Sequence, residues 1–119
     1  MIELIKPLFH LQESEINVLL YIYRTKYETY TANFIAEELY LTSVRANQIL
    51  FKLLKEGLLV REKSISDSRK MEWKYRPVDQ KGDRITLFVK LLNDAFNEKL
   101  ADLIAFFEDE DQYENPQKQ

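Results

Sequence analysis

The segment "LTSVRANQILFKLLKEGLLV", residues 41–60, constrains the fold most strongly, because it combines a helical repeat with a firm stop. Its apolar residues step by three, one and three along the chain: Ala46, Ile49, Leu50 and Leu53. This spacing places them on one face of a helix. Gly57 follows, and a glycine just past a helix commonly ends it in the left-handed conformation. We therefore expect a core-facing helix over residues 43–56.

Two further helices are predicted before this one. In "QESEINVLLYIYRTK" the apolar residues recur at helical spacing, which predicts a helix over about residues 13–26. In "TANFIAEEL", Thr31 is a good N-cap for a short helix. The residues of that helix expected to face inward are Phe34, Ile35 and Leu39. The second and third of these helices have the order and spacing of a helix-turn-helix.

Two short β-favouring runs follow Gly57. The runs "LLVREK" and "MEWKYR" are separated by "SISDSRK", and in the second run Met71, Trp73 and Tyr75 alternate with charged residues. A period of two is what a half-buried antiparallel strand needs. The intervening segment is too long for a tight hairpin turn and carries Arg69 and Lys70. The pattern predicts a hairpin with a protruding basic loop, as in the wing of a winged helix.

Residues 83–108 predict one long helix of about 39 Å at 1.5 Å per residue. Its apolar residues are so numerous that only a narrow polar strip remains, and a small domain cannot cover such a helix on one face alone. Burial against a second copy of the chain is the simplest solution, and a purely intramolecular role is the alternative. The interface expected for the homodimer comprises Ile85, Phe88, Leu92, Phe96, Leu100, Leu103 and Phe107.

The predicted fold is therefore mostly α with a small β-hairpin, a winged helix-turn-helix with a long C-terminal dimerisation helix. We assign the winged helix domain to residues 1–82 and the long helix to residues 83–109. Residues 110–119 form a polar, acidic tail that we expect to be disordered.

The chain is acidic overall, with 17 Lys and Arg against 20 Asp and Glu and a net charge of −3, but the charge is unevenly distributed. Residues 41–82 hold 10 basic and 5 acidic residues, net +5, whereas residues 1–40 and 83–119 carry −3 and −5. Phosphate binding depends on local charge, because counterions are released only where Lys and Arg meet the nucleic-acid backbone. Double-stranded DNA is therefore a candidate partner, and an ordinary solvated charged face is the alternative.

The composition argues against several other classes. The chain has no cysteine, which excludes disulfides and thiolate metal sites, and His10, its one histidine, lies between apolar residues as structural histidines do. It has no glycine-rich phosphate loop and no nucleophile–histidine arrangement beyond His10, so we expect no enzymatic activity, no metal and no cofactor. No apolar run approaches the roughly 20 residues of a membrane span, and the N-terminus lacks a signal-peptide pattern. A cytoplasmic protein without membrane contact is expected.

Residues 11–75 resemble the DNA-binding core of MarR-type winged helix regulators. The segments that carry the resemblance are "LQESEINVLLYIY", "FIAEEL" and "LTSVRANQILFKLLKEGLLVRE". The loop "DSRK" resembles the D-x-R element of that family through Asp67 and Arg69, which implies that this pair braces the wing and aims basic groups at the DNA backbone. The resemblance implies a DNA-binding transcriptional regulator, for instance a repressor.

The chain departs from that family at both ends. Only about ten residues precede the core, where such regulators usually have a long helix, and one C-terminal helix replaces the two that are often present. Dimerisation would then depend on the final helix, as in penicillinase-repressor or PadR-like proteins. "MEWKYRPVD" followed by a long helix is also similar to the winged helix of transcription initiation factor E, alpha type. That likeness implies an alternative function, a protein-interaction module of a transcription initiation complex with little sequence-specific DNA binding.

For DNA binding, the outward residues of the helix over residues 43–56 would meet base edges in the major groove. Arg45 can offer a bidentate fork to guanine, and Asn47 or Gln48 can pair with adenine. The wing, about residues 64–70, would contact the backbone or the minor groove. The full set of expected DNA contacts is Thr42, Ser43, Val44, Arg45, Asn47, Gln48, Lys52, Arg61, Lys63, Arg69 and Lys70. A small-molecule effector is compatible with the sequence, which identifies none.

Overall fold

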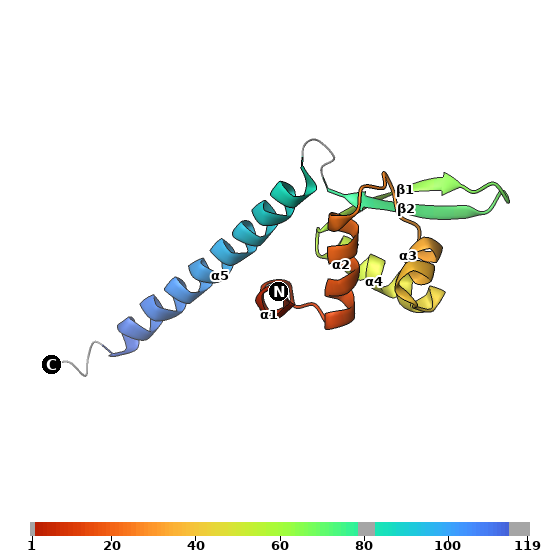
Figure 1. Ribbon diagram of the computed structural model, residues 1–119. Helices are drawn as coiled ribbons and strands as arrows, with labels where there is room; N and C mark the ends of the chain where they lie inside the picture. The colour runs from red at the N-terminus through yellow and green to blue at the C-terminus, as the bar shows by residue number, and fades with distance from the viewer. Residues whose placement is uncertain (1, 79–82, 115–119) are drawn as a thin grey trace.

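The computed structural model describes residues 2–78 and 83–114, and it has the predicted winged helix-turn-helix architecture (Figure 1). The helices are α1 (Ile2–Phe9), α2 (Glu13–Arg24), α3 (Ala32–Leu39), α4 (Ser43–Lys55) and α5 (Arg84–Glu114), and the strands are β1 (Leu59–Ile65) and β2 (Met71–Pro77). Helices α1 to α4 and the hairpin form a compact head, from which α5 projects. The predicted domain boundary at residue 82 and tail residues 115–119 lie outside the described residues.

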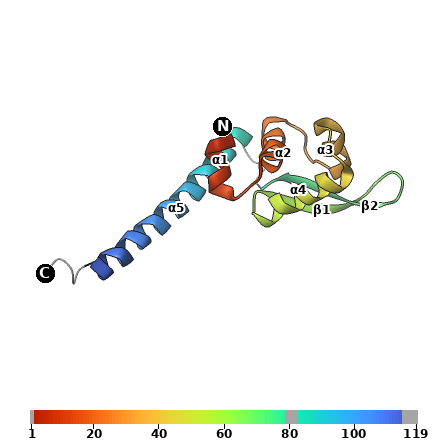
Figure 2. The same cartoon turned by 90° about the horizontal axis from the view of Figure 1, so that it is seen from below.

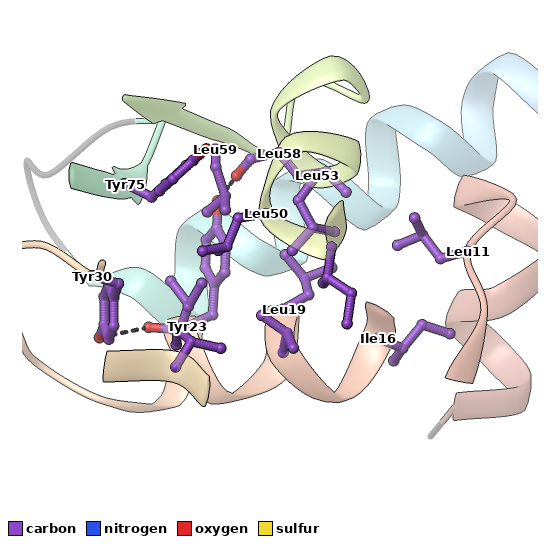
Figure 3. Close-up of a cluster of buried hydrophobic side chains, with 14 of the residues drawn as sticks. Leu11, Ile16, Leu19, Tyr23, Tyr30, Leu50, Leu53, Leu58, Leu59 and Tyr75 are labelled. Carbon is purple, nitrogen blue, oxygen red and sulfur yellow. Dashed lines mark hydrogen bonds between the residues drawn. The ribbon is translucent and has the colours of Figure 1, made fainter. Parts of the chain in front are cut away.

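The core of the head lies where α2, α4 and the base of the hairpin meet (Figure 3). All four predicted stripe residues of α4 are fully buried, as are their neighbours on α2. Tyr23 of α2 joins this core to the start of β1, because its hydroxyl donates a 2.7 Å hydrogen bond to the carbonyl of Leu58. Burial raises the pKa of Tyr23 to about 12, so this donor stays protonated at neutral pH. In the short helix α3, only Ile35 of the three expected residues is fully buried, and Phe34 and Leu39 are half-buried.

Side-chain caps set the helix starts close to where the sequence predicts them. The Thr31 hydroxyl accepts a hydrogen bond from the backbone N–H of Phe34, and the Thr42 hydroxyl accepts one from Arg45. At the start of α2, the Glu15 carboxylate accepts a 2.7 Å hydrogen bond from the backbone N–H of Gln12. Each cap satisfies a backbone donor that the first turn of a helix leaves unpaired.

Helix α1 is the element that the sequence pattern missed. It is only eight residues long and contains Pro7 in its last turn. Pro7 has no backbone N–H to donate to the carbonyl of Glu3, so this short helix depends on its packing against the head. Ile5 and Phe9 are buried against the head and anchor the helix. His10 follows with a left-handed backbone, φ 55°, and its Nε2 lies 3.2 Å from the Lys99 ammonium of α5.

The hairpin is longer and its turn is tighter than predicted. β1 extends to Ile65, which pairs with Met71, and Ser66 pairs with Lys70 beyond it through a 2.8 Å backbone hydrogen bond. Only residues 67–69 remain as a three-residue loop, so the expected long loop over residues 64–70 is wrong. Arg69 supplies the left-handed position, φ 61°, that such a loop commonly requires. Burial along β2 is graded, from exposed Met71 to buried Tyr75, because the strand leaves the head as it approaches the turn.

Tyr30 adds a third, one-residue strand to the hairpin. Its backbone N–H and C=O both bond to Tyr75 at 2.8 Å, in an antiparallel bridge. The Tyr30 side chain is fully buried and donates to the carbonyl of Ile22, 3.1 Å away. Tyr30 thus ties the hairpin to the C-terminal end of α2.

Helix α5 leaves the head as a long projecting arm (Figures 1 and 2). Its first turns pack against α1 and α2 through Phe88, Leu91, Leu92 and Ala95, and every residue from 96 to 109 is exposed. The radius of gyration is 18.9 Å, against about 13–14 Å for a compact domain of this length. The helix continues to Glu114, so the expected disordered tail does not begin at residue 110. No glycine or proline occurs between Gly82 and Pro116, so nothing in the sequence breaks the helix earlier.

Tyr40 ends α3 with a strained backbone, and we predict that Tyr40→Gly stabilises the protein. Tyr40 has φ 56° and a side chain that is 95% exposed, so no burial offsets the strain. Glycine removes a left-handed penalty of about 1–2 kcal/mol and adds roughly 0.5–1 kcal/mol of chain entropy cost. The free energy of unfolding, measured by denaturant titration, should therefore rise by about 0.5–1 kcal/mol.

The matched control is Glu37→Gly, an exposed position within α3 where glycine should lower the free energy of unfolding by about 1 kcal/mol. If Tyr40→Gly were as destabilising as the control, the strain argument would be wrong.

Candidate nucleic-acid interface

The outer face of α4 carries most of the predicted contact residues and is open to solvent. Thr42, Ser43, Asn47 and Gln48 are exposed, and Val44 is 68% exposed although it is apolar. Lys52, one turn further along, is half-buried. The sequence therefore places these side chains correctly on the surface.

The guanidinium of Arg45 already has partners within the protein, whereas the predicted bidentate contact with guanine needs it to be free. Its Nη2 donates hydrogen bonds to the side-chain oxygen of Gln12, 3.0 Å away, and to the hydroxyl of Ser14, 2.8 Å away. Both partners lie at the start of α2, so the guanidinium links the first turn of α4 to that of α2. Nη1 and Nε of Arg45 have no hydrogen bond among the described residues. Reading a guanine with two nitrogens would require the Nη2 contacts to rearrange.

Two polar contacts organise the N-terminal turn of α4. The Asn47 amide donates a 3.0 Å hydrogen bond to the carbonyl of Ser43, one turn back. The Ser43 hydroxyl in turn donates to the side-chain oxygen of Asn33 on α3, 3.3 Å away. These contacts are exposed, and polar groups in exposed hydrogen bonds of this kind exchange readily for other partners such as water or a base edge.

The side chain of Arg61, on β1, is stacked between Phe51 of α4 and Trp73 of β2. Its guanidinium carbon lies 3.8 Å from the ring centre of Trp73 and 5.5 Å from that of Phe51 on α4. Its Nη1 donates to the Tyr75 hydroxyl at 3.2 Å. Lys63, its neighbour on the same strand face, lies 5.5 Å from the Trp73 ring. Arg61 therefore braces the hairpin against α4, and Lys63 stays exposed.

The tip of the hairpin is basic and held by Ser66. The Ser66 carbonyl accepts from the backbone N–H of Arg69, and the Ser66 hydroxyl accepts from that of Lys70. The Ser68 hydroxyl lies 2.9 Å from that of Ser66. Ser66 therefore holds the turn through its hydrogen bonds. The family resemblance implied that Asp67 and Arg69 would brace the wing instead. Arg69 and Lys70 are both exposed.

A hollow of about 200 Å³ lies between α4 and the hairpin. It is lined by Thr31 and the first residues of α3, by Asn47 of α4, and by Met71, Glu72 and Trp73 of β2. Asn47 and the hairpin therefore border one recess, so α4 and the wing form a continuous surface.

Two features of the structure were not predicted from the sequence pattern. Phe51 is 46% exposed on the polar side of α4, where an apolar residue off the core stripe was the available signal. Arg84, the first residue of α5, has its Nη1 within hydrogen-bond distance of the carbonyls of Ile22 and Thr25 and of the Tyr30 hydroxyl, and its Nη2 donates to the carbonyl of Tyr27. No local sequence signal connects residues so far apart in the chain.

The predicted dimer surface on α5 is mostly free, with one correction. Ile85, Phe96, Leu100, Leu103 and Phe107 are exposed, and Leu92 is half-buried. Phe88 is only 8% exposed, because its ring packs against Tyr23 of the head at 5.3 Å between ring centres. Phe88 belongs to the core, and its place on the exposed face is taken by the neighbouring Val89.

In residues 2–78 and 83–114 no group of three or more His, Cys, Asp or Glu side chains could hold a metal ion. Among the described helices, none has both the length and the apolar character needed to cross a membrane.

No protein-family model matches the chain, and no curated protein sequence matches it. Among solved structures it is similar to a possible transcriptional regulator from Methanosarcina mazei Go1, with a TM-score of 0.66 and 15% identity over 89% of this chain and 87% of that one. A protein from the thermoacidophilic archaeon Sulfolobus tokodaii has the same TM-score at 22% identity, over 87% and 92% of the two chains. MepR of Staphylococcus aureus, solved as a complex with DNA, has a TM-score of 0.54 at 19% identity, over 87% and 84%. These likenesses show that the winged helix fold is shared.

The stacked position of Arg61 generates a prediction that uses the single tryptophan of the chain. Arg61→Lys keeps the charge but loses the planar stack on Trp73, so the tryptophan emission should shift towards that of a hydrated indole. Arg61→Ala should lower the free energy of unfolding by about 1–2 kcal/mol. Lys63→Ala, on the same strand face, is the control and should stay within about 0.5 kcal/mol of wild type. Unchanged emission in Arg61→Lys would contradict the bracing role.

Proposed function

We propose that the protein is a DNA-binding transcriptional regulator that acts as a homodimer. In this proposal α4 enters the major groove and the wing lies on the backbone or in the minor groove. The main support for the proposal is the continuous surface formed by the outer face of α4 and the hairpin. This surface lies in the one stretch of an acidic chain that has a net positive charge, residues 41–82. The likeness to MepR, solved with DNA, supports the same reading.

The contact surface divides into base-reading and backbone-binding parts. Val44, Gln48 and Asn47 lie on the open face near the start of α4, the part of a recognition helix that meets base edges. An exposed valine suits a thymine methyl group, and the two amides suit adenine. Lys63, Arg69 and Lys70 stand on the wing and suit phosphates. Arg45 either keeps its links to α2 or exchanges them for a base on binding.

The homodimer is supported by the uncovered part of α5. Large apolar side chains are exposed along the arm, and a soluble monomer rarely exposes an apolar surface of this extent. A dimer also presents two recognition helices to one duplex, which raises affinity and gives a two-fold symmetric site. An effector ligand stays an open prediction.

A specific observation favours the alternative, a protein-interaction module. Tyr40 is almost fully exposed beside α4 and is held in a strained conformation, and a large aromatic side chain in such a position suits a protein partner. Tyr40→Ala tests whether the exposed ring contacts DNA. It should leave DNA affinity within twofold if Tyr40 serves a protein partner alone.

The DNA test measures affinity by fluorescence anisotropy across a salt series, on sites selected from random DNA. Lys70→Ala should weaken binding to all sequences and reduce the salt slope by about one. Gln48→Ala should cost about 1–3 kcal/mol at the selected site and relax one base position. Lys90→Ala removes an exposed charge from α5, away from the proposed interface, and should bind as wild type does. Binding that is absent or insensitive to salt in the wild-type protein would reject the regulator and favour the interaction module.

The oligomer test measures mass by light scattering. Leu103→Glu places a charge among the exposed apolar side chains of α5 and should give a monomer, because burying an unpaired carboxylate is costly. Ala101→Glu, two residues earlier on another face of the same helix, is the matched control and should stay dimeric. A monomeric wild-type protein, or an unchanged mass for Leu103→Glu, would contradict the proposed dimer.

A further inference from the structure

Most of the exposed large apolar residues of α5 form a line along one side of the helix, and Ile104 and Phe106 flank this line near its C-terminal end. We call this line the seam, and its members are Ile85, Val89, Leu92, Phe96, Leu100, Leu103 and Phe107. Apart from half-buried Leu92, each is between 44% and 63% exposed. At about 100° of rotation per residue, the seven positions fall within roughly 80° of arc. The seam is about 33 Å long.

The spacing of the seam is 4, 3, 4, 4, 3 and 4 residues, which has two consequences. First, it is an 11-residue repeat, so the stripe drifts around the helix by only about 20° per repeat, in the opposite sense to the drift of a 7-residue repeat. Second, the spacing reads the same in both directions from Phe96. A helix with such a symmetric stripe matches a second copy of itself running the opposite way.

We propose that two copies of α5 pair antiparallel along the seam, with the two-fold axis at Phe96. This inference rests on the homodimer of the proposed function and adds its orientation and register. Phe96 then faces Phe96 of the second copy, Leu92 faces Leu100, Val89 faces Leu103 and Ile85 faces Phe107. Every seam residue meets another seam residue, so the whole line is buried without a gap.

The acidic residues of α5 within residues 84–109 fit this arrangement because they lie away from the seam. Asp94 and Glu98 project about 160° from its centre, and Asp102 and Glu108 about 120°. Two such helices therefore bring no carboxylates together at their contact. Lys99 stands at the edge of the seam, about 60° from its centre, and contacts His10 of its own head.

The position of the head relative to the seam decides whether an antiparallel or a parallel pair of α5 helices can bring both heads to one DNA duplex. Phe88 and Ala95, which pack against the head, lie about 80–100° from the seam centre. In an antiparallel pair the two-fold axis is perpendicular to the plane of the two helices, so both heads lie on the same side of that plane. In a parallel pair the axis runs along the helices and puts the heads on opposite sides. Two recognition helices can reach one duplex only from the same side.

The test uses single cysteines, which the wild-type chain lacks entirely. Facing Cα atoms of two helices 8–10 Å apart lie about 4–5 Å from each other, within the range of a disulfide. Phe96→Cys should therefore oxidise to a covalent dimer. Val89→Cys and Leu103→Cys lie about 21 Å from their own copies in the antiparallel pair, so each alone should give roughly tenfold less covalent dimer. A mixture of the two should crosslink to each other.

The outcomes are distinguishable on a non-reducing gel. A parallel pair in register would crosslink Val89→Cys and Leu103→Cys with their own copies, and that result would overturn the proposal. Equal, weak crosslinking at every position would also overturn it, because no register would then be preferred. Should Phe96→Cys weaken the dimer by removing its ring, the mixed Val89→Cys and Leu103→Cys pair still gives the answer with Phe96 intact. The assay contains no DNA, so a failure of DNA binding does not affect it.

Discussion

The arrangement of the molecule depends on the set of contacts around Tyr30. This residue is fully buried, its backbone pairs with β2, and its hydroxyl reaches the last turn of α2. Arg84 approaches the same hydroxyl from α5 at 2.9 Å. One residue therefore joins the hairpin, α2 and the projecting arm, and we call this set of contacts the joint.

Arg84 suits this joint for reasons of charge and shape. The last carbonyls of α2 have no partner within the helix and carry the negative end of its dipole. A guanidinium has several donors in a fixed plane, so one residue can reach the carbonyl of Ile22 in the last turn of α2, those of Thr25 and Tyr27 just beyond it, and the Tyr30 hydroxyl. A lysine would bring the charge without this geometry. Because Arg84 is also the first residue of α5, these contacts tie the start of the arm to the end of α2.

Local patterns in the sequence were sufficient to predict most of the head. The stripe through Ala46 and Leu53, the threonine caps and the glycine stop each act within a few residues, and each appears in the structure as expected. The features that were missed have two causes. The burial of Phe88 depends on Tyr23 of α2, which is far away in the chain. The tight turn of the wing depends on the backbone pairing of Ser66 with Lys70, which no apolar pattern indicates. No spacing within α5 distinguishes the face that meets the head from the face that stays open.

In the candidate interface, the contacts of the charged residues were likewise not predicted by local sequence patterns. The sequence predicted that Arg45 contacts a guanine and that Arg61 and Arg69 contact DNA on or near the wing, and the structure gives each a position that local patterns did not indicate. Arg45 links two helices, Arg61 is stacked on Trp73, and Arg69 occupies the strained position of a turn. The DNA-facing charge that is free of intramolecular contacts is therefore smaller than the net charge of +5 suggests. Which of the eleven predicted residues touch DNA stays a prediction, because the sequence and the fold fix their exposure and not their partners.

The joint and the seam together determine how two heads could act on one duplex. Because the arm is attached near Arg84 and Phe88, the rotation of α5 about its own axis is set by buried contacts within the head. That rotation fixes the angle between the head and the seam, and hence the side on which the second head lies. A rotation of α5 by one residue, about 100°, would turn the seam towards the head and carry the partner's head away from the DNA. In the proposed dimer, the contacts of Phe88 and Arg84, far from the outer face of α4, therefore determine the geometry of DNA recognition together with the residues on that face.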